Sequence, residues 1–136
     1  MQNWMLPYWP VLAALGAMGG LMLIQILVVD VAGIRARHPP GKPVEADHAN
    51  FLFRATRAHG NTNESIAVFL LLALFGVFSG APAAWLNGLT WVYVAGRIAH
   101  MLCYYADLKT LRSTAFAIAL AALIGMLVAG VLPWVP

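Results

Sequence analysis

Four long apolar stretches dominate the sequence and constrain its fold more than any other feature. They cover approximately residues 8–31, 50–78, 84–105 and 113–132. A helix of about 20 apolar residues crosses the ~30 Å hydrocarbon core of a bilayer, and each stretch is long enough to do so. Charged residues make up only 10% of the chain, whereas soluble domains carry about 25%. We therefore predict an all-α integral membrane protein, with residues 1–136 forming a single domain of four transmembrane helices.

The connections between these stretches differ in character. Residues 34–48 form a polar loop broken by prolines, residues 79–82 a tight uncharged turn, and residues 106–112 a short charged loop. Irregular polar backbone of this kind does not cross lipid. Helices joined by short links pack as antiparallel neighbours. The sequence therefore predicts a four-helix bundle with up-down topology.

The positive charges are distributed unevenly along the chain. Arg and Lys gather in the first and third loops and in the helix ends beside them, whereas the second loop and both chain ends have none. The positive-inside rule then predicts that loops one and three are cytoplasmic and that both termini lie on the opposite side. Trp4, Tyr8, Trp9 and Trp134 fit an aromatic belt on that outer side. The net charge of +3 is modest, and no basic run suggests a nucleic-acid partner.

The second apolar stretch begins with a stripe of polar residues. At 100° per residue, Arg54, Arg57, Asn61 and Glu64 fall within about 80° of one another, and His59 falls on another side. Ionisable groups in a membrane helix are costly unless they face protein or water, so we expect this stripe to pack inward. One alternative is that Glu64 pairs with an arginine and only pins the helix to its neighbours. The donors exceed what Glu64 can accept, which favours an additional anionic partner.

The third apolar stretch repeats this arrangement. Arg97, His100 and Tyr104 share one face, and Arg112 follows just before the fourth stretch. Taken alone, Arg112 could be an interfacial arginine whose charge reaches the membrane surface. Together these groups predict a cationic pocket near the cytoplasmic side for a small molecule with carboxylates and amides. Nothing resembles a metal site, because the histidines are dispersed and Cys103 is the single cysteine.

These residues resemble a known family. The second-helix pattern around Arg57, Asn61 and Glu64, and the later Arg97-x-x-His100-x-x-x-Tyr104 with Arg112-Ser113, are similar to motifs of the MAPEG family of membrane-associated proteins in eicosanoid and glutathione metabolism. The resemblance implies a homotrimer that binds glutathione at subunit interfaces open to the cytoplasm. It also implies that Arg112 stabilises the glutathione thiolate. The expected glutathione-binding residues are Arg35, Arg54, Arg57, Asn61, Glu64, Arg97, His100 and Tyr104, with Arg37 as an alternative to Arg35.

The resemblance favours a glutathione-dependent membrane transferase or peroxidase that acts on a lipophilic electrophile or hydroperoxide. A free thiol has a pKa near ~8.5, and an adjacent cation lowers it. Two alternatives remain open at this stage. One is a non-catalytic family member that binds a lipid. The other is a small four-helix exporter, which is disfavoured because the only carboxylate of the first stretch, Asp30, stands at its end.

Overall fold

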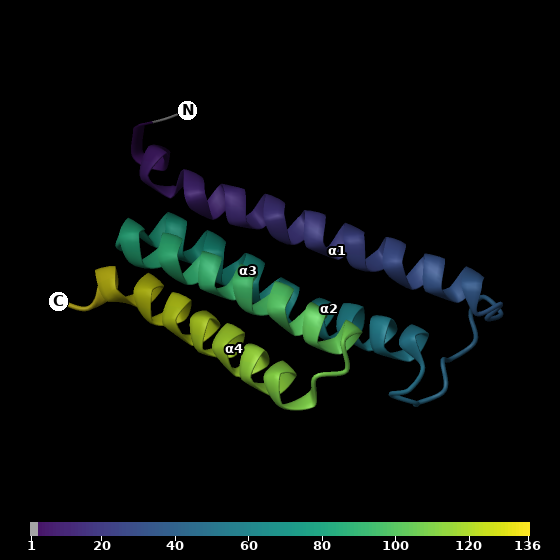
Figure 1. The fold of residues 1–136 in the computed structure, drawn as a ribbon. Coiled ribbons are helices and arrows are strands. Elements are labelled where there is room, and N and C mark those ends of the chain that lie inside the picture. Colours follow the sequence, from purple (N-terminus) through teal and green to yellow (C-terminus); the bar gives the residue numbers. More distant parts are fainter. Residues whose placement is uncertain (1–2) are drawn as a thin grey trace.

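The computed structural model describes residues 3–136 and shows a bundle of four long antiparallel helices (Figure 1). The first and last described residues, Asn3 and Pro136, lie at one end of the bundle, together with the turn between α2 and α3. The other two loops, residues 36–50 and 106–108, lie at the opposite end, which we call the polar end. The elements in chain order are η1 (Asn3–Tyr8), α1 (Trp9–Arg35), α2 (Phe51–Ser79), α3 (Ala83–Tyr105), α4 (Lys109–Val131) and η2 (Leu132–Trp134). The predicted all-α four-helix architecture is confirmed.

Three segments are apolar and long enough to cross a membrane: Trp4–Arg35, Phe51–Ser79 and Lys109–Trp134. The α3 helix is less apolar, since it contains Asn87, Arg97 and His100. Two of these polar side chains, Arg97 and His100, are buried inside the bundle. A helix whose polar groups face protein does not need to be apolar on every side, so α3 can lie among the three apolar helices without exposing those two groups to lipid.

Two helices are longer at the polar end than the sequence predicted. The α1 helix continues to Arg35 instead of ending near residue 31, because no proline follows Pro10 of its first turn until Pro39 and Pro40. The α4 helix begins at Lys109 instead of residue 113, directly after the short connection that contains Asp107 with a φ of 56°. Arg112 therefore lies in the first turn of α4 and not in a loop.

Local signals define the limits of α2. The Asn50 side chain accepts a hydrogen bond from the Leu52 N–H at 2.9 Å, which satisfies one of the free donors at the start of the helix. At the other end Gly80 adopts a φ of 74°, and the Ala81 N–H bonds back to the Gly76 carbonyl at 3.0 Å. This left-handed glycine ends the helix and begins the turn to α3.

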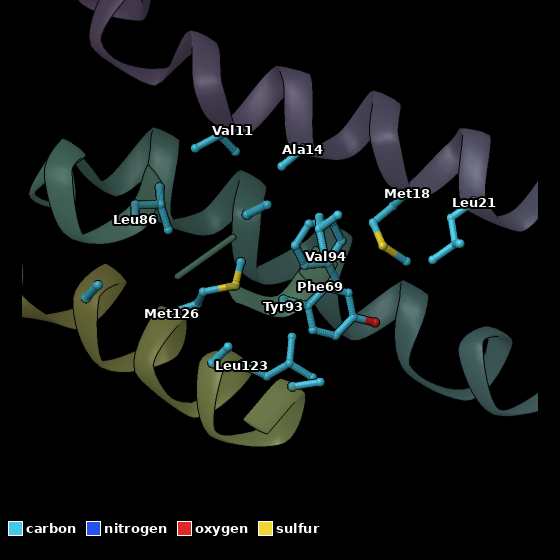
Figure 2. Close-up of a cluster of buried hydrophobic side chains, with 14 of the residues drawn as sticks. Val11, Ala14, Met18, Leu21, Phe69, Leu86, Tyr93, Val94, Leu123 and Met126 are labelled. Atoms are coloured by element: carbon cyan, nitrogen blue, oxygen red, sulfur yellow. The ribbon is translucent and has the colours of Figure 1, made fainter. Parts of the chain in front are cut away.

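The apolar core is built from all four helices (Figure 2). Phe69 of α2 and Tyr93 of α3 stack with their ring centroids 4.3 Å apart and their planes 11° from parallel. The α3 and α4 backbones approach closely at Gly96, where an added Cβ would lie 3.1 Å from the Cβ of Ala119. Small residues allow such close approach, which is a main source of helix association in membranes.

The segment around the start of α1 is attached to the α2–α3 turn and to α3, at the end opposite the polar end. The Tyr8 hydroxyl donates to the Ala81 carbonyl at 2.6 Å. Asn87 Nδ2 donates to the Pro7 carbonyl at 2.9 Å, and Trp91 Nε1 donates to the Pro10 carbonyl at 3.1 Å. The start of α1 is therefore held in place by three side-chain hydrogen bonds.

Candidate functional site

Arg97 lies at the centre of a buried polar network between α2 and α3. Its Nη2 donates to Asn61 Oδ1 at 2.9 Å and to Thr62 Oγ1 at 3.2 Å. Thr62 Oγ1 also accepts a hydrogen bond from Gln25 Nε2 of α1 at 3.1 Å. The Arg97 side chain is only 1% exposed. The two polar stripes predicted for the second and third helices therefore meet at Asn61 and Arg97.

A cavity of about 220 Å³ lies beside this network, between α2, α3 and α4. Its lining residues are Asn61, His100, Arg112, Ser113 and Phe116. Arg112 Nη1 and His100 Nδ1 are buried and have no hydrogen-bond partner within residues 3–136. Since buried polar atoms are normally paired, these two unpaired atoms on lining residues mark the cavity as a candidate site for a polar ligand.

Aromatic contacts hold Arg112 and His100, the two cavity residues with unpaired buried nitrogens. The Arg112 guanidinium carbon lies 4.3 Å from the centroid of the Tyr104 ring. The ring of His100 meets Tyr104 edge-on with centroids 5.0 Å apart, and it lies 6.2 Å from the ring of Phe116. Three predicted site residues, His100, Tyr104 and Arg112, therefore form one continuous group.

Arg57 and Glu64 correct the expectation that the whole α2 stripe packs inward. Both side chains are exposed on the single chain, and neither makes an ion pair or hydrogen bond with residues 3–136. The buried face of α2 contains Ala58, Thr62 and Phe69, and Thr62 and Glu64 point about 160° apart on a helix. Within one chain, the ion pair between Glu64 and a stripe arginine that would only pin the helix is therefore not formed.

Arg54 belongs to a different part of the molecule from the cavity. Its Nη1 donates to the carbonyls of His48 and, at 3.2 Å, Ala49, and its Nη2 donates to the Tyr105 carbonyl at 3.4 Å. These contacts tie the start of α2 to loop 36–50 and to the end of α3. Arg54 does not line the cavity. The sequence prediction placed it in the pocket because helical spacing gives the direction in which a side chain points but not which other helices lie at the same level along the bundle.

Arg35 also lies apart from the cavity. It is exposed and lines a separate, mostly apolar groove of about 610 Å³ between α1 and the start of α2. The remaining lining residues are Ile24, Leu27, Val28, Val31, Ala32, Ala36, Asn50, Phe51 and Leu52. The alternative residue, Arg37, lines another groove, formed with loop 36–50. His59, predicted to point away from the stripe, bonds to Asn63 at 3.1 Å and not to the stripe residues.

Sequence reasoning missed Gln25, Thr62 and Phe116. A signal existed for Gln25, because it is a polar residue in the middle of an otherwise apolar helix. Thr62 follows Asn61 directly but falls on the buried side of α2, where Ala55 and Ala58 also lie. The small alanines mark the face that contacts other helices. Phe116 gave no signal, since aromatic residues are common in membrane helices.

The fold and the site together define a class: a multi-pass α-helical membrane protein with a cationic cavity between its helices. A model of the MAPEG family matches residues 11–132, nearly the whole chain. The protein therefore belongs to the MAPEG family, which confirms the resemblance found in the sequence. None of the curated proteins matches the chain.

Proposed function

We propose that the protein is a glutathione-dependent membrane transferase or peroxidase and that Arg112 stabilises the glutathione thiolate. The observation that carries this proposal is the buried, unpartnered Nη1 of Arg112 at the cavity. A guanidinium always carries its charge and cannot act as a base. Its role towards a thiol is therefore to favour the thiolate, which is the nucleophilic form.

The reaction follows from this electrostatic role. The thiol proton leaves to water, and the thiolate sulfur attacks the electrophilic atom of a lipophilic substrate as the bond from that atom to its leaving group breaks and the leaving group departs with the electron pair. With a hydroperoxide the sulfur attacks the outer oxygen, the O–O bond breaks, and the departing alkoxide takes a proton from water to become the alcohol. In this proposal Arg112 stabilises the developing negative charge on sulfur, while Asn61 and His100, which line the same cavity, offer polar contacts to the rest of glutathione. Catalysis would rest on thiolate stabilisation and proximity.

The size of the cavity supports a site shared between chains. Pockets that enclose small ligands usually measure about 300–1,000 Å³, and a single chain provides only about 220 Å³ here. Arg57 and Glu64 are exposed on the same helix as Asn61 and form no hydrogen bond or ion pair within residues 3–136. We propose that a homotrimer, as the family resemblance implies, completes the glutathione site with these outward-facing groups.

We further propose that the polar end is cytoplasmic. All the Lys and Arg residues except Arg97 lie in or beside loops 36–50 and 106–108, and the opposite end has none. The positive-inside rule then places these two loops in the cytoplasm and both termini outside. Alkaline phosphatase fused to the C-terminus of the chain, expressed in a bacterium, should be active. An active fusion within residues 38–46 combined with an inactive C-terminal fusion would reverse this orientation.

The central test measures thiolate formation. Glutathione added to the detergent-solubilised protein should produce the ultraviolet absorbance of a thiolate at neutral pH. Arg112→Leu should lower this signal about 10- to 100-fold, the equivalent of losing one charge-assisted hydrogen bond of about 1.5–3 kcal/mol. Lys109→Leu is the matched control, since it removes an exposed cation from the same helical turn.

The alternative, a non-catalytic lipid-binding member of the family, predicts a different result. The wild-type protein would then retain a lipid through purification, and glutathione would produce neither a thiolate signal nor a binding isotherm. A wild-type thiolate signal that Arg112→Leu leaves unchanged would remove Arg112 from the mechanism.

A further inference from the structure

The network behind the cavity fixes which atom of Asn61 faces a ligand. Arginine can donate hydrogen bonds but cannot accept them. The Asn61 atom that lies 2.9 Å from Arg97 Nη2 must therefore be the carboxamide oxygen, Oδ1. This assignment follows from the chemistry of the partner, although oxygen and nitrogen of an amide look alike in many structures. The amide nitrogen Nδ2 is then left to face the cavity that Asn61 lines.

Arg97 is itself held by Thr62, which is in turn bonded to Gln25 of α1. The Thr62 hydroxyl accepts hydrogen bonds from both Arg97 Nη2 and Gln25 Nε2, and it donates to the Ala58 carbonyl at 3.1 Å. A hydroxyl offers one donor and two acceptor positions, so all of its capacity is used. Gln25 and Thr62 are both 0% exposed. Neither residue can reach a ligand, and both act on the cavity only through Arg97.

The burial of these groups requires an explanation beyond packing. A polar side chain in a membrane interior is costly, and an apolar residue at position 25 would pack against α2 without that cost. Gln25 nevertheless stands alone as a polar residue in the middle of α1. Its hydrogen bond joins α1 to the α2–α3 network. The three helices are thereby held in one register around Asn61.

We propose that Gln25, Thr62 and Arg97 are positioning residues that orient Asn61 so that its amide donates into the cavity. Asn61 and Arg112 then both present N–H donors, and the group that binds between them is an acceptor, a carboxylate or a carbonyl oxygen. This inference rests on the proposed glutathione site for the identity of its ligand. It also assigns Arg97, which is 1% exposed, to the support of Asn61 instead of direct ligand contact.

The sharpest variant is Asn61→Asp, which is nearly isosteric. Its carboxylate would form an ion pair with Arg97, so the thermal midpoint in detergent should be unchanged or higher. The cavity would lose the amide donor and gain an acceptor, and glutathione affinity measured by calorimetry should fall at least tenfold. A protein that binds glutathione as tightly as wild type after Asn61→Asp would overturn the proposal.

Thr62→Val tests the positioning step and has a matched control. Thr90 is also 0% exposed, and its hydroxyl bonds only to the Asn87 carbonyl of its own helix. Thr62→Val should weaken glutathione binding about fivefold or more and raise KM for glutathione with little change in kcat. Thr62→Ser should restore both values, and Thr90→Val should leave them at the wild-type level.

A measurement without glutathione separates this proposal from the proposed function. The side-chain amide signal of Asn61 can be followed by ¹⁵N NMR in detergent micelles and assigned by its loss in Asn61→Asp. Thr62→Val should shift or broaden this signal, and Thr90→Val should not. If the wild type binds no glutathione but the signal responds as expected, the proposed ligand is wrong and the positioning role stands. If Thr62→Val leaves the signal unchanged, the positioning role is wrong.

Discussion

The polar stripes of α2 and α3 look alike in the sequence but are used differently in the structure. The α3 stripe faces into its own chain, where Arg97 bonds to Asn61 and Thr62 and where His100 and Tyr104 pack together. On α2, Arg57 and Glu64 are exposed and form no hydrogen bond or ion pair with residues 3–136. The polar groups of the α3 stripe are therefore bonded or packed within the chain, whereas the outer part of the α2 stripe is free to bind a group that the chain itself does not supply.

The largest effect should come from Arg97→Leu, because it removes the support itself. Asn61 and Thr62 would lose their shared donor, and an unsatisfied buried polar group costs about 1–3 kcal/mol. We expect a lower thermal midpoint in detergent together with a loss of glutathione affinity of about 100-fold. Arg97→Lys should recover part of the stability, since it keeps a donor at the same place. If Arg97→Leu bound glutathione as tightly as wild type, the α3 stripe would not be a support for the binding site.

Arg57→Leu should separate stability from binding. Arg57 is exposed and forms no hydrogen bond or ion pair with residues 3–136, so the thermal midpoint of the dissociated chain should stay within experimental error of wild type. Glutathione affinity should fall about tenfold, which corresponds to about 1.4 kcal/mol. Lys42→Leu, which removes an exposed cation from loop 36–50, is the control for the loss of charge alone. A stability loss equal to that of Arg97→Leu would show that Arg57 also belongs to the internal support.

Gly96→Ala tests whether the α3 stripe depends on its neighbour α4. The added Cβ would lie 3.2 Å from the Ala119 backbone nitrogen and 3.3 Å from the Ala115 carbonyl oxygen. Because backbone cannot move aside easily, we expect a loss of stability of about 1–3 kcal/mol. Gly88→Ala on the same helix meets nothing within 4 Å and should be neutral or stabilising. Equal midpoints for the two variants would indicate that the helices can separate slightly at Gly96 without cost.

The smallest effect should come from Tyr104, which packs against Arg112 through its ring. A cation–π contact contributes about 0.5–2 kcal/mol. Tyr104→Leu should therefore reduce the thiolate signal of bound glutathione several-fold, and Tyr104→Phe should retain it. If Tyr104→Phe is as weak as Tyr104→Leu, the hydroxyl is the important group and the ring contact is not.

The sequence predicted the helices well because lipid demands long apolar runs, and it predicted that polar residues would share faces because helical spacing is regular. It could not predict which way a stripe points. Arg57 and Asn61 lie only about 40° apart on the α2 helix, yet one is exposed and the other bonds to Arg97. That difference is set by where α3 and α4 pack, which depends on small residues such as Ala58 and Gly96.

The sequence also could not predict where along the bundle axis each polar side chain finds its partners. Arg54 shares the angular position of the stripe, but its donors are used by backbone carbonyls at the polar end. Loop 36–50 must fold back over the start of α2 before that contact can form, and no local pattern in the sequence reports such folding. Arg112 was placed in a loop because the start of α4 lacks a side-chain N-cap that would mark it.

The attachment of α1 has a mechanical consequence. Its first residues are held by hydrogen bonds from Tyr8, Asn87 and Trp91, and its middle is held by Gln25. Beyond Gln25, no α1 side chain within the described residues forms a hydrogen bond to another helix. The last ten residues of α1 form one wall of the apolar groove that contains Arg35. Apart from Gln25, the contacts of this half of α1 with the rest of the bundle therefore include no side-chain hydrogen bond, so the packing of apolar surface is what holds this wall of the groove closed against α2.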